Sequence, residues 1–97
     1  MTFVQIIDFE TTSMSEMNAL MDEWLASTEG KRTTMADMLM HDRENPQHYV
    51  EMVEFPSYED AMRNNDLPET QQFAEQMRKL CTSGPSFLNL DVERRDS

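Results

Sequence analysis

Hydrophobic and polar positions divide the chain into four strand-like and two helix-like stretches. Residues 3–11 are rich in β-branched and aromatic side chains and predict a strand, and apolar residues on both of its faces indicate that both are covered. Residues 33–41 and 48–55 predict two more strands, which the polar segment 42–47, with its Asn-Pro turn signal, joins into a hairpin. Residues 86–92 alternate polar and apolar side chains and predict the last strand.

Apolar residues at helical spacing predict a helix after the first strand. Ser13 and Glu16 form a capping-box pattern, and Gly30 is suited to end the helix because it adopts a left-handed conformation at little cost. A second helical stretch opens at Ser57, which pairs with Asp60 as a cap. The apolar stripe of the first helix consists of Met14, Met17, Leu20, Met21, Trp24 and Leu25.

The second helical stretch contains a break. Pro68 disfavours helix in the residues before it, so segment 64–68 interrupts the stretch. Asp66 and Glu69 form another capping-type pair, and the helix then continues until the Gly-Pro of segment 82–85 ends it. Its apolar stripe is Phe73, Met77 and Leu80.

The elements follow in the order β-α-β-β-α-β, which is typical of an α+β, ferredoxin-like fold. We expect residues 1–97 to form a single domain, an antiparallel four-stranded sheet with two helices on one face, and residues 93–97 to be a frayed tail. Apolar side chains on both faces of the strands would leave a large exposed patch on the other face. Pairing two sheets face to face would cover it, so we expect a homodimer.

Composition and charge exclude several classes of function. Acidic residues outnumber basic ones 19 to 8, and the formal charge of −11 repels phosphate backbones and anionic lipid, so we expect no nucleic-acid or membrane partner. No apolar run is long enough to span a membrane and the N-terminus lacks a signal-peptide pattern, so we expect a cytoplasmic protein. Cys81, the one cysteine, excludes an internal disulfide and is interpreted as a half-buried small hydrophobe.

Residues 50–61 carry a resemblance to a known family. They read as a strand that ends in an aromatic residue, followed by a helix start of the form x-S-x-E-x-A. With the order of elements, this segment resembles the dimeric α+β barrel superfamily and, within it, the antibiotic biosynthesis monooxygenase-like proteins. The resemblance implies a cavity between helices and sheet, in which some members oxidise polyketide aromatics with oxygen and no bound cofactor, while others degrade heme and others have no known reaction.

The resemblance does not extend to a heme site. Heme-degrading members use a Trp early in the second helix and a His about two turns later, positions that fall near Asn64 and near Gln72 or Phe73 here. Residues 58–81 contain no His, and only Gln5 is comparable with an amide that these enzymes carry in the first strand. We therefore expect no heme and no other cofactor.

Glu51 and Gln5 are the candidate catalytic residues. Glu51 shares a strand face with Tyr49 and, if that face lines the cavity, it is a partly desolvated carboxylate and a candidate base. Gln5 would supply a hydrogen-bonding amide beside it. The alternative is that one or both pair with polar groups at the dimer contact. The candidate substrate-binding residues are Trp24, Asn64 and Tyr49. The alternative is that Trp24 is a core anchor, as such a Trp more often is, and that Asn64 is a turn residue.

His41 and His48 flank the predicted hairpin turn. In a symmetric loop they would face each other across the strands and, with Asp42, could resemble a two-His, one-carboxylate metal site. Asp42 would point to the opposite face if the strand continued, so we interpret the pair as solvated histidines and expect no metal.

Two functions remain open. The chain is predicted to be a small-molecule cavity protein that, if catalytic, is a cofactor-independent oxygenase for an aromatic or polyketide-like substrate. The alternative is a non-catalytic ligand-binding or interaction module on the same fold. A wide cavity that holds a polar group favours the first interpretation, and a cavity filled by Met side chains favours the second.

Overall fold

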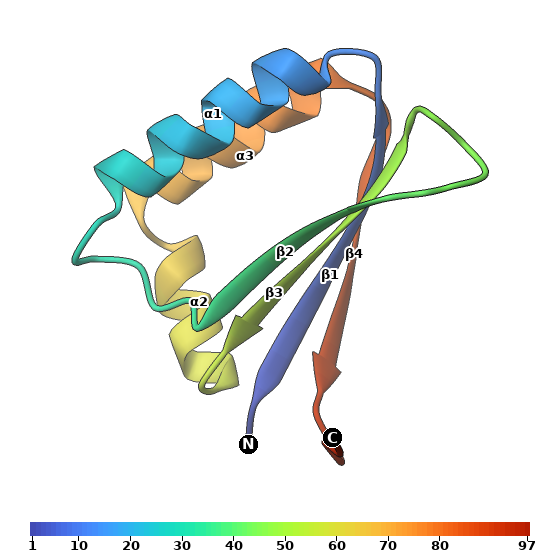
Figure 1. The fold of residues 1–97 in the computed structure, drawn as a ribbon. Coiled ribbons are helices and arrows are strands. Elements are labelled where there is room, and N and C mark those ends of the chain that lie inside the picture. The colour runs from blue at the N-terminus through green and yellow to red at the C-terminus, as the bar shows by residue number, and fades with distance from the viewer.

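Four antiparallel strands form one sheet in the order β2–β3–β1–β4 in the computed structural model, which describes residues 1–97 (Figure 1). The helices lie on one side of this sheet, with α1 and α3 side by side, and the termini lie together at one end of the sheet (Figure 1). The elements are β1 (Phe3–Thr11), α1 (Met14–Ser27), β2 (Ala36–His41), β3 (His48–Phe55), α2 (Tyr58–Asn65), α3 (Pro68–Leu80) and β4 (Cys81–Asp91). The predicted ferredoxin-like fold is confirmed, and the predicted break divides the second helical stretch into α2 and α3.

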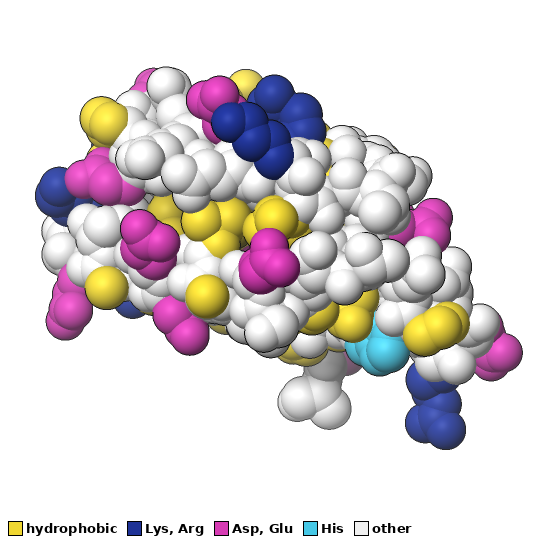
Figure 2. Space-filling model, turned by 90° about the horizontal axis from the view of Figure 1, so that it is seen from above, with side chains coloured by type: hydrophobic (Ala, Val, Ile, Leu, Met, Phe, Trp, Pro, Cys, Tyr) yellow, Lys and Arg dark blue, Asp and Glu magenta, His cyan; other side chains and the backbone are white.

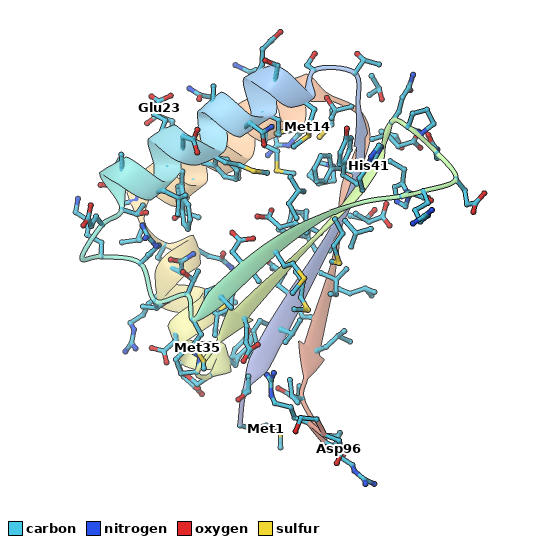
Figure 3. The ribbon with its side chains drawn as sticks, in the orientation of Figure 1. Met1, Met14, Glu23, Met35, His41 and Asp96 are labelled. Carbon is cyan, nitrogen blue, oxygen red and sulfur yellow. The ribbon has the colours of Figure 1, made fainter.

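The core lies between the helices and the face of the sheet that they cover. Its residues are Phe3, Ile7, Phe9, Met17, Val53, Phe55, Ala61 and Met77. Met17 and Met77 come from the two predicted helical stripes, so part of the high methionine content fills the core. Glu23 points away from the sheet on the outer side of α1, as the polar side of an amphipathic helix should (Figure 3).

The first helix is capped differently from the prediction. Ser13 is the N-cap residue but its side chain makes no capping hydrogen bond. Instead the Thr11 hydroxyl accepts a hydrogen bond from the Ser13 amide at 3.0 Å and donates one to the Leu80 carbonyl at 2.6 Å. The helix ends at Ser27, and Gly30, with φ of 81°, lies in the turn beyond it. The capping box predicted for this helix is therefore wrong.

The two caps predicted for the second helical stretch have opposite outcomes. The Ser57 side chain accepts a hydrogen bond from the Asp60 amide at 3.1 Å, as predicted. The pair Asp66 and Glu69 does not cap α3, because Leu67 is the N-cap residue and makes no side-chain bond. Pro68 occupies the first turn, where backbone N–H groups have no partner within the helix, so the missing N–H of proline costs no hydrogen bond.

Two strands differ in length from the prediction. Strand β2 begins at Ala36 rather than at residue 33, because the Thr33 hydroxyl donates to the Asp60 carbonyl at 2.6 Å and holds this segment against α2. Strand β4 begins at Cys81 rather than at residue 86, so the Gly-Pro segment lies inside the strand. Cys81 is half-buried, as predicted, and burial raises the pKa of its thiol.

Gly84 allows β4 to continue through this segment. Its φ is 81°, in the left-handed region, and the pairing of β4 with β1 shifts register here, between Asp8 and Glu10. A Cβ atom at Gly84 would lie 2.8 Å from the Asp8 carbonyl oxygen. A close approach of two strands and a positive φ therefore both require glycine at this position.

Replacement of Gly84 by alanine is expected to reduce the free energy of unfolding by roughly 2–3 kcal/mol, because left-handed strain and a backbone contact act together. Gly30→Ala is the matched control: its φ is also 81°, but a Cβ atom there has nothing within 4 Å. The control should lose about 1 kcal/mol, the conformational cost alone. Urea denaturation of both variants checks this, and equal losses would contradict it.

The sheet face opposite the helices is apolar and exposed. The register aligns one apolar row across the sheet, and Met40 and Leu90 lie on the same face. Met38, Met40, Leu88 and Leu90 are between 38% and 60% exposed. The predicted two-sided distribution of apolar residues is thus present in the structure. The row consists of Met38, Met52, Ile6 and Leu88.

The predicted tail makes one ion pair with this face. The Arg95 guanidinium lies 2.6 Å from the carboxylate of Glu54, which is 9% exposed.

No helix of the protein has the length and apolar character that a membrane crossing requires.

Candidate active site

A cavity of about 360 Å³ lies between the helices and the covered face of the sheet. All three helices and all four strands contribute side chains to its lining. In the view of Figure 2, hydrophobic side chains gather in a hollow with acidic side chains on either side of it. Its volume suits a small organic ligand, and its mixture of apolar walls with a few polar groups is typical of ligand sites.

Glu51 lies at the centre of the sheet and faces the cavity. The antiparallel register places it between Leu39 on β2 and Ile7 on β1. Its side chain is 5% exposed and lines the cavity together with Trp24 and Phe73 of the helices. Glu51 therefore occupies the helix-covered face, whereas the ion pair with Arg95 is made by Glu54 on the opposite face.

Burial changes the acidity of Glu51. Desolvation in the cavity, with additional contributions from a hydrogen bond to Asp37 and from the negative charge of Asp37, raises the pKa of Glu51 from 4.5 to about 9. Asp37 also lines the cavity, one register position away on the neighbouring strand β2. At neutral pH, Glu51 is thus a protonated acid that can donate a hydrogen bond to the Asp37 carboxylate.

Gln5 lies beside this pair of acids. It stands opposite Val53 on β3, which stands opposite Asp37 on β2. Its side-chain nitrogen donates a hydrogen bond to the Asn89 side-chain oxygen at 3.1 Å, which fixes the direction of the amide. Gln5 lines the cavity on the same side of the sheet as Glu51.

Trp24 forms part of the helical wall of the cavity. Its indole N–H donates to the Thr70 hydroxyl at 2.9 Å, and its ring centroid lies 6.0 Å from that of Phe73. The Arg32 guanidinium carbon lies 5.8 Å from the centre of the indole ring. These contacts hold the ring in one orientation, with one part of its surface towards the cavity.

Asn64 is the most buried amide that lines the cavity. It is 4% exposed, and its side-chain oxygen accepts a hydrogen bond from the Thr33 amide at 3.4 Å. Asn64 lines the cavity beside its neighbour Asn65 at the end of α2.

The structure thus brings together four of the five predicted site residues: Gln5, Trp24, Glu51 and Asn64 all line the cavity. Tyr49 shares the strand face of Glu51 but does not line the cavity. It stacks between His41 and Phe9, with centroids 4.5 Å and 5.8 Å away.

Asp37 was not among the predicted site residues. The sequence could not have revealed it, because the symmetric turn predicted there, with His41 facing His48, would place Asp37 and Glu51 on opposite faces of the sheet. Finding it needed the register, which pairs Leu39 with Glu51 and thereby places Asp37 diagonally across from Glu51.

The two histidines do not face each other. The register pairs His41 with Tyr49 and His48 with Glu10, so the two rings lie on opposite faces of the sheet. His41 bonds to the Pro46 carbonyl at 2.9 Å, at the hairpin end of the sheet (Figure 3). The predicted cross-strand pair is therefore wrong, and no group of His, Cys, Asp or Glu side chains is arranged to hold a metal ion.

His48 lies between two carboxylates. Its Nδ1 lies 2.7 Å from the Asp42 carboxylate and its Nε2 lies 2.9 Å from the Asp8 carboxylate. The hydrogen bond to Asp42 is the largest cause that raises the pKa of His48, and the hydrogen bond to Asp8 is the next. The hydrogen bond between His48 and Asp42 also lowers the pKa of Asp42. The protonated ring links the hairpin turn to β1, so its contribution to stability is present at acidic pH and is lost as the pH rises through the raised pKa.

Solved structures resemble the chain over nearly its whole length. SnoaB, a cofactor-independent oxygenase from Streptomyces nogalater, superposes with a TM-score of 0.81, covering 97% of this chain and 95% of that chain at 14% identity. A Mycobacterium tuberculosis protein superposes with a TM-score of 0.81 over 100% of both chains at 16% identity. An antibiotic biosynthesis monooxygenase superposes with a TM-score of 0.76, covering 97% of this chain and 100% of that chain at 17% identity.

No protein-family model matches the chain, and no curated protein matches it. The superpositions cover the whole order of elements, from β1 to β4, so the resemblance seen in residues 50–61 is confirmed for the fold. The chain therefore shares its ferredoxin-like fold with SnoaB and with the antibiotic biosynthesis monooxygenase.

Proposed function

We propose that this protein binds a small aromatic or polyketide-like molecule in the cavity and oxidises it with molecular oxygen, without a bound cofactor. The observation that carries the proposal is the position of Glu51: this residue, which is 5% exposed, lines a 360 Å³ cavity beside an oriented amide and an aromatic wall. Buried acids with strongly raised pKa values concentrate at functional sites. SnoaB, which has the same fold, is a cofactor-independent oxygenase.

Glu51 acts as the base in this proposal. The ionised carboxylate takes a proton from a phenol or from a carbon activated by neighbouring carbonyl groups, and the electron pair stays on the substrate as an enolate or carbanion. Because the pKa of Glu51 is about 9, its affinity for a proton is close to that of a phenolate, whose pKa is about 10. Proton transfer between the two groups is therefore nearly balanced.

Oxygen is the oxidant. The carbanion transfers electrons to O₂ and forms a carbon–oxygen bond, which gives a peroxide that takes up a proton. When the attacked carbon is a methylene group, loss of water converts the hydroperoxide into a ketone, so one O₂ yields one carbonyl oxygen and one water. The Gln5 amide is placed to stabilise the negative oxygen of the enolate, and Asn64 and Trp24 position the ring.

The alternative is a ligand-binding module without chemistry. An oxygen electrode distinguishes the two, with an anthrone-type substrate that carries an activated methylene group between aromatic rings. The proposal predicts consumption of one O₂ per ketone formed, above the rate of the uncatalysed reaction. Saturable binding of the same compound without oxygen uptake would instead establish the binding module.

We also propose that two copies pair through the apolar sheet face. An exposed apolar row across all four strands is a surface that a second identical sheet can cover by two-fold symmetry. Sedimentation at micromolar concentration is expected to give twice 11.4 kDa, about 23 kDa.

Met38→Glu is expected to convert this dimer into a monomer, because Met38 is 50% exposed at one end of the row and a charge there would be buried without a partner. Gln76→Glu, which adds the same charge to an exposed position on α3, should leave the dimer intact. A wild-type mass of 11.4 kDa would contradict the proposed pairing.

A further inference from the structure

We propose that Phe73 determines the length of the ligand that the cavity accepts, because with Trp24 it forms a wall of two rings between the cavity and a second hollow. This inference rests on the proposed function, in which the cavity binds an aromatic molecule, and narrows its ligands to compact ones without a long substituent. It is carried by the lining of the two hollows and by the contacts of the two rings.

The second hollow, of about 110 Å³, lies between α1 and α3, which run side by side (Figure 1). Side chains of these two helices alone line it, and Trp24 and Phe73 are the two residues that line both this hollow and the 360 Å³ cavity. Glu23, which lines only the second hollow, points away from the sheet (Figure 3). The second hollow therefore lies on the outer side of the helices, and the two rings stand between it and the cavity.

Trp24 is the anchored half of this wall. In the preceding turn of α1, Leu20 lines only the second hollow and Met21 lines only the cavity, so Trp24 lies at the boundary between the two. Its indole N–H donates to the Thr70 hydroxyl at 2.9 Å, and the Arg32 guanidinium carbon lies 5.8 Å from its ring centre. A hydrogen bond and a cation–π contact thus fix the Trp24 ring between the helices.

Phe73 is the half of the wall that packing alone holds in place. In the following turn of α3, Gln76 lines only the second hollow and Met77 lines only the cavity, so Phe73 lies at the same boundary. Its ring centroid lies 6.0 Å from that of Trp24, and the ring packs against the core. Because a phenyl ring has no polar group, a smaller side chain at position 73 opens the wall without leaving a hydrogen-bonding group unsatisfied.

The wall sets the point at which a ligand must end. A phenol whose hydroxyl lies at Glu51, as in the proposed function, meets the two rings when its substituent points towards the helices. Further methylene groups on that substituent would have to displace the rings, so burial of these groups adds little affinity. With a smaller side chain in place of Phe73, the two hollows join and the 110 Å³ beyond the wall becomes available. Residue 73 therefore decides between compact and elongated ligands.

A short and a long phenol, 4-ethylphenol and 4-heptylphenol, test the inference. Trp24 is the one tryptophan of the chain, so its fluorescence reports binding at the wall. Phe73→Ala should bind 4-heptylphenol about 10-fold more tightly than the wild type does, from burial of roughly two more methylene groups. The affinity for 4-ethylphenol, which ends before the wall, should change less than about threefold. Phe73→Leu, which keeps a core side chain, should increase the affinity for 4-heptylphenol about fourfold, from roughly one methylene group.

Two further variants separate the joining of the hollows from the loss of a core side chain. Leu20→Ala enlarges the second hollow alone and should bind both phenols as the wild type does. Ser27→Phe, which adds a ring to the second hollow, should cancel the gain in 4-heptylphenol affinity when it is combined with Phe73→Ala.

The outcomes distinguish this inference from the proposed function. If the wild type binds 4-ethylphenol but neither Phe73 variant binds 4-heptylphenol more tightly, the inference is overturned and the cavity function stands. A gain in 4-heptylphenol affinity that persists with Ser27→Phe overturns it in the same way. If the wild type binds neither phenol, the proposed ligand-binding function fails, and the inference fails with it.

Discussion

Replacement of Glu51 by glutamine is expected to stabilise the protein, and to do so increasingly as the pH rises. The pKa of Glu51 is about 9 in the fold and 4.5 in the unfolded chain, so folding requires uptake of a proton between these values. A group of this kind contributes its full stability below the unfolded pKa and loses it as the pH rises towards the folded pKa. The free energy of unfolding should therefore fall by about 1.4 kcal/mol per pH unit through this window on account of Glu51.

Glutamine has nearly the same shape, does not ionise, and can donate a hydrogen bond to Asp37. The stabilisation by Glu51→Gln is the difference between its free energy of unfolding and that of the wild type. This difference should be about 4 kcal/mol larger at pH 8 than at pH 5, since three pH units separate the two conditions. Urea denaturation at both pH values and at one fixed protein concentration measures this difference. Glu54→Gln should show no comparable increase, because Glu54 is paired with Arg95 and its replacement removes an attractive partner. A Glu51→Gln variant less stable than the wild type at pH 8 would contradict the account.

The same substitution is expected to reduce oxygen-dependent turnover by roughly 10²- to 10⁴-fold, the usual contribution of a positioned base. In the wild type, only about 1% of Glu51 is ionised at pH 7, so the rate should rise about tenfold per pH unit and level off near pH 9. Steady-state oxygen uptake from pH 6 to pH 10, corrected for the uncatalysed reaction, measures this profile. Equal turnover by Glu51→Gln and wild type would exclude Glu51 as the base.

Asp37→Asn provides a separate test of the neighbouring acid. The hydrogen bond and the negative charge of Asp37 both raise the pKa of Glu51, so their removal should move the midpoint of the rate profile to lower pH. The midpoint should remain above 4.5, because desolvation is the largest cause of the shift and is unaffected. An unchanged midpoint would show that Asp37 does not act on Glu51.

Much of the fold could be predicted from the sequence because local patterns and global topology agree. The strand at residues 3–11, the hairpin and the break before Pro68 each carry their own local signal and were predicted close to their observed bounds. Errors arose where a tertiary contact replaced the local one. Thr11 satisfies the start of α1 in place of the Ser13 side chain, and pairing with β1 extends β4 through Gly84.

The positions of the candidate residues depend on strand parity and on register. Strand parity placed Glu51 on the face of Tyr49 and Gln5 on the face of Ile7, and the register shows that both faces belong to the helix-covered side that lines the cavity. Parity alone could not select Asp37, whose distance from Glu51 depends on the register of the hairpin. The register likewise separates His41 from His48, because the six-residue turn does not close symmetrically: His41 pairs with Tyr49.

The ionisation of Glu51 inside the cavity is the central claim, and its direct titration is the most direct test. Carbon-13 NMR of the side-chain carboxyl of Glu51, assigned by comparison with Glu51→Gln, should show a chemical-shift change with its midpoint near pH 9. The Glu51 resonance should remain that of a protonated carboxyl at pH 7. A midpoint near the ordinary value of 4.5 would show that Glu51 is solvated and ionised, and would contradict the account.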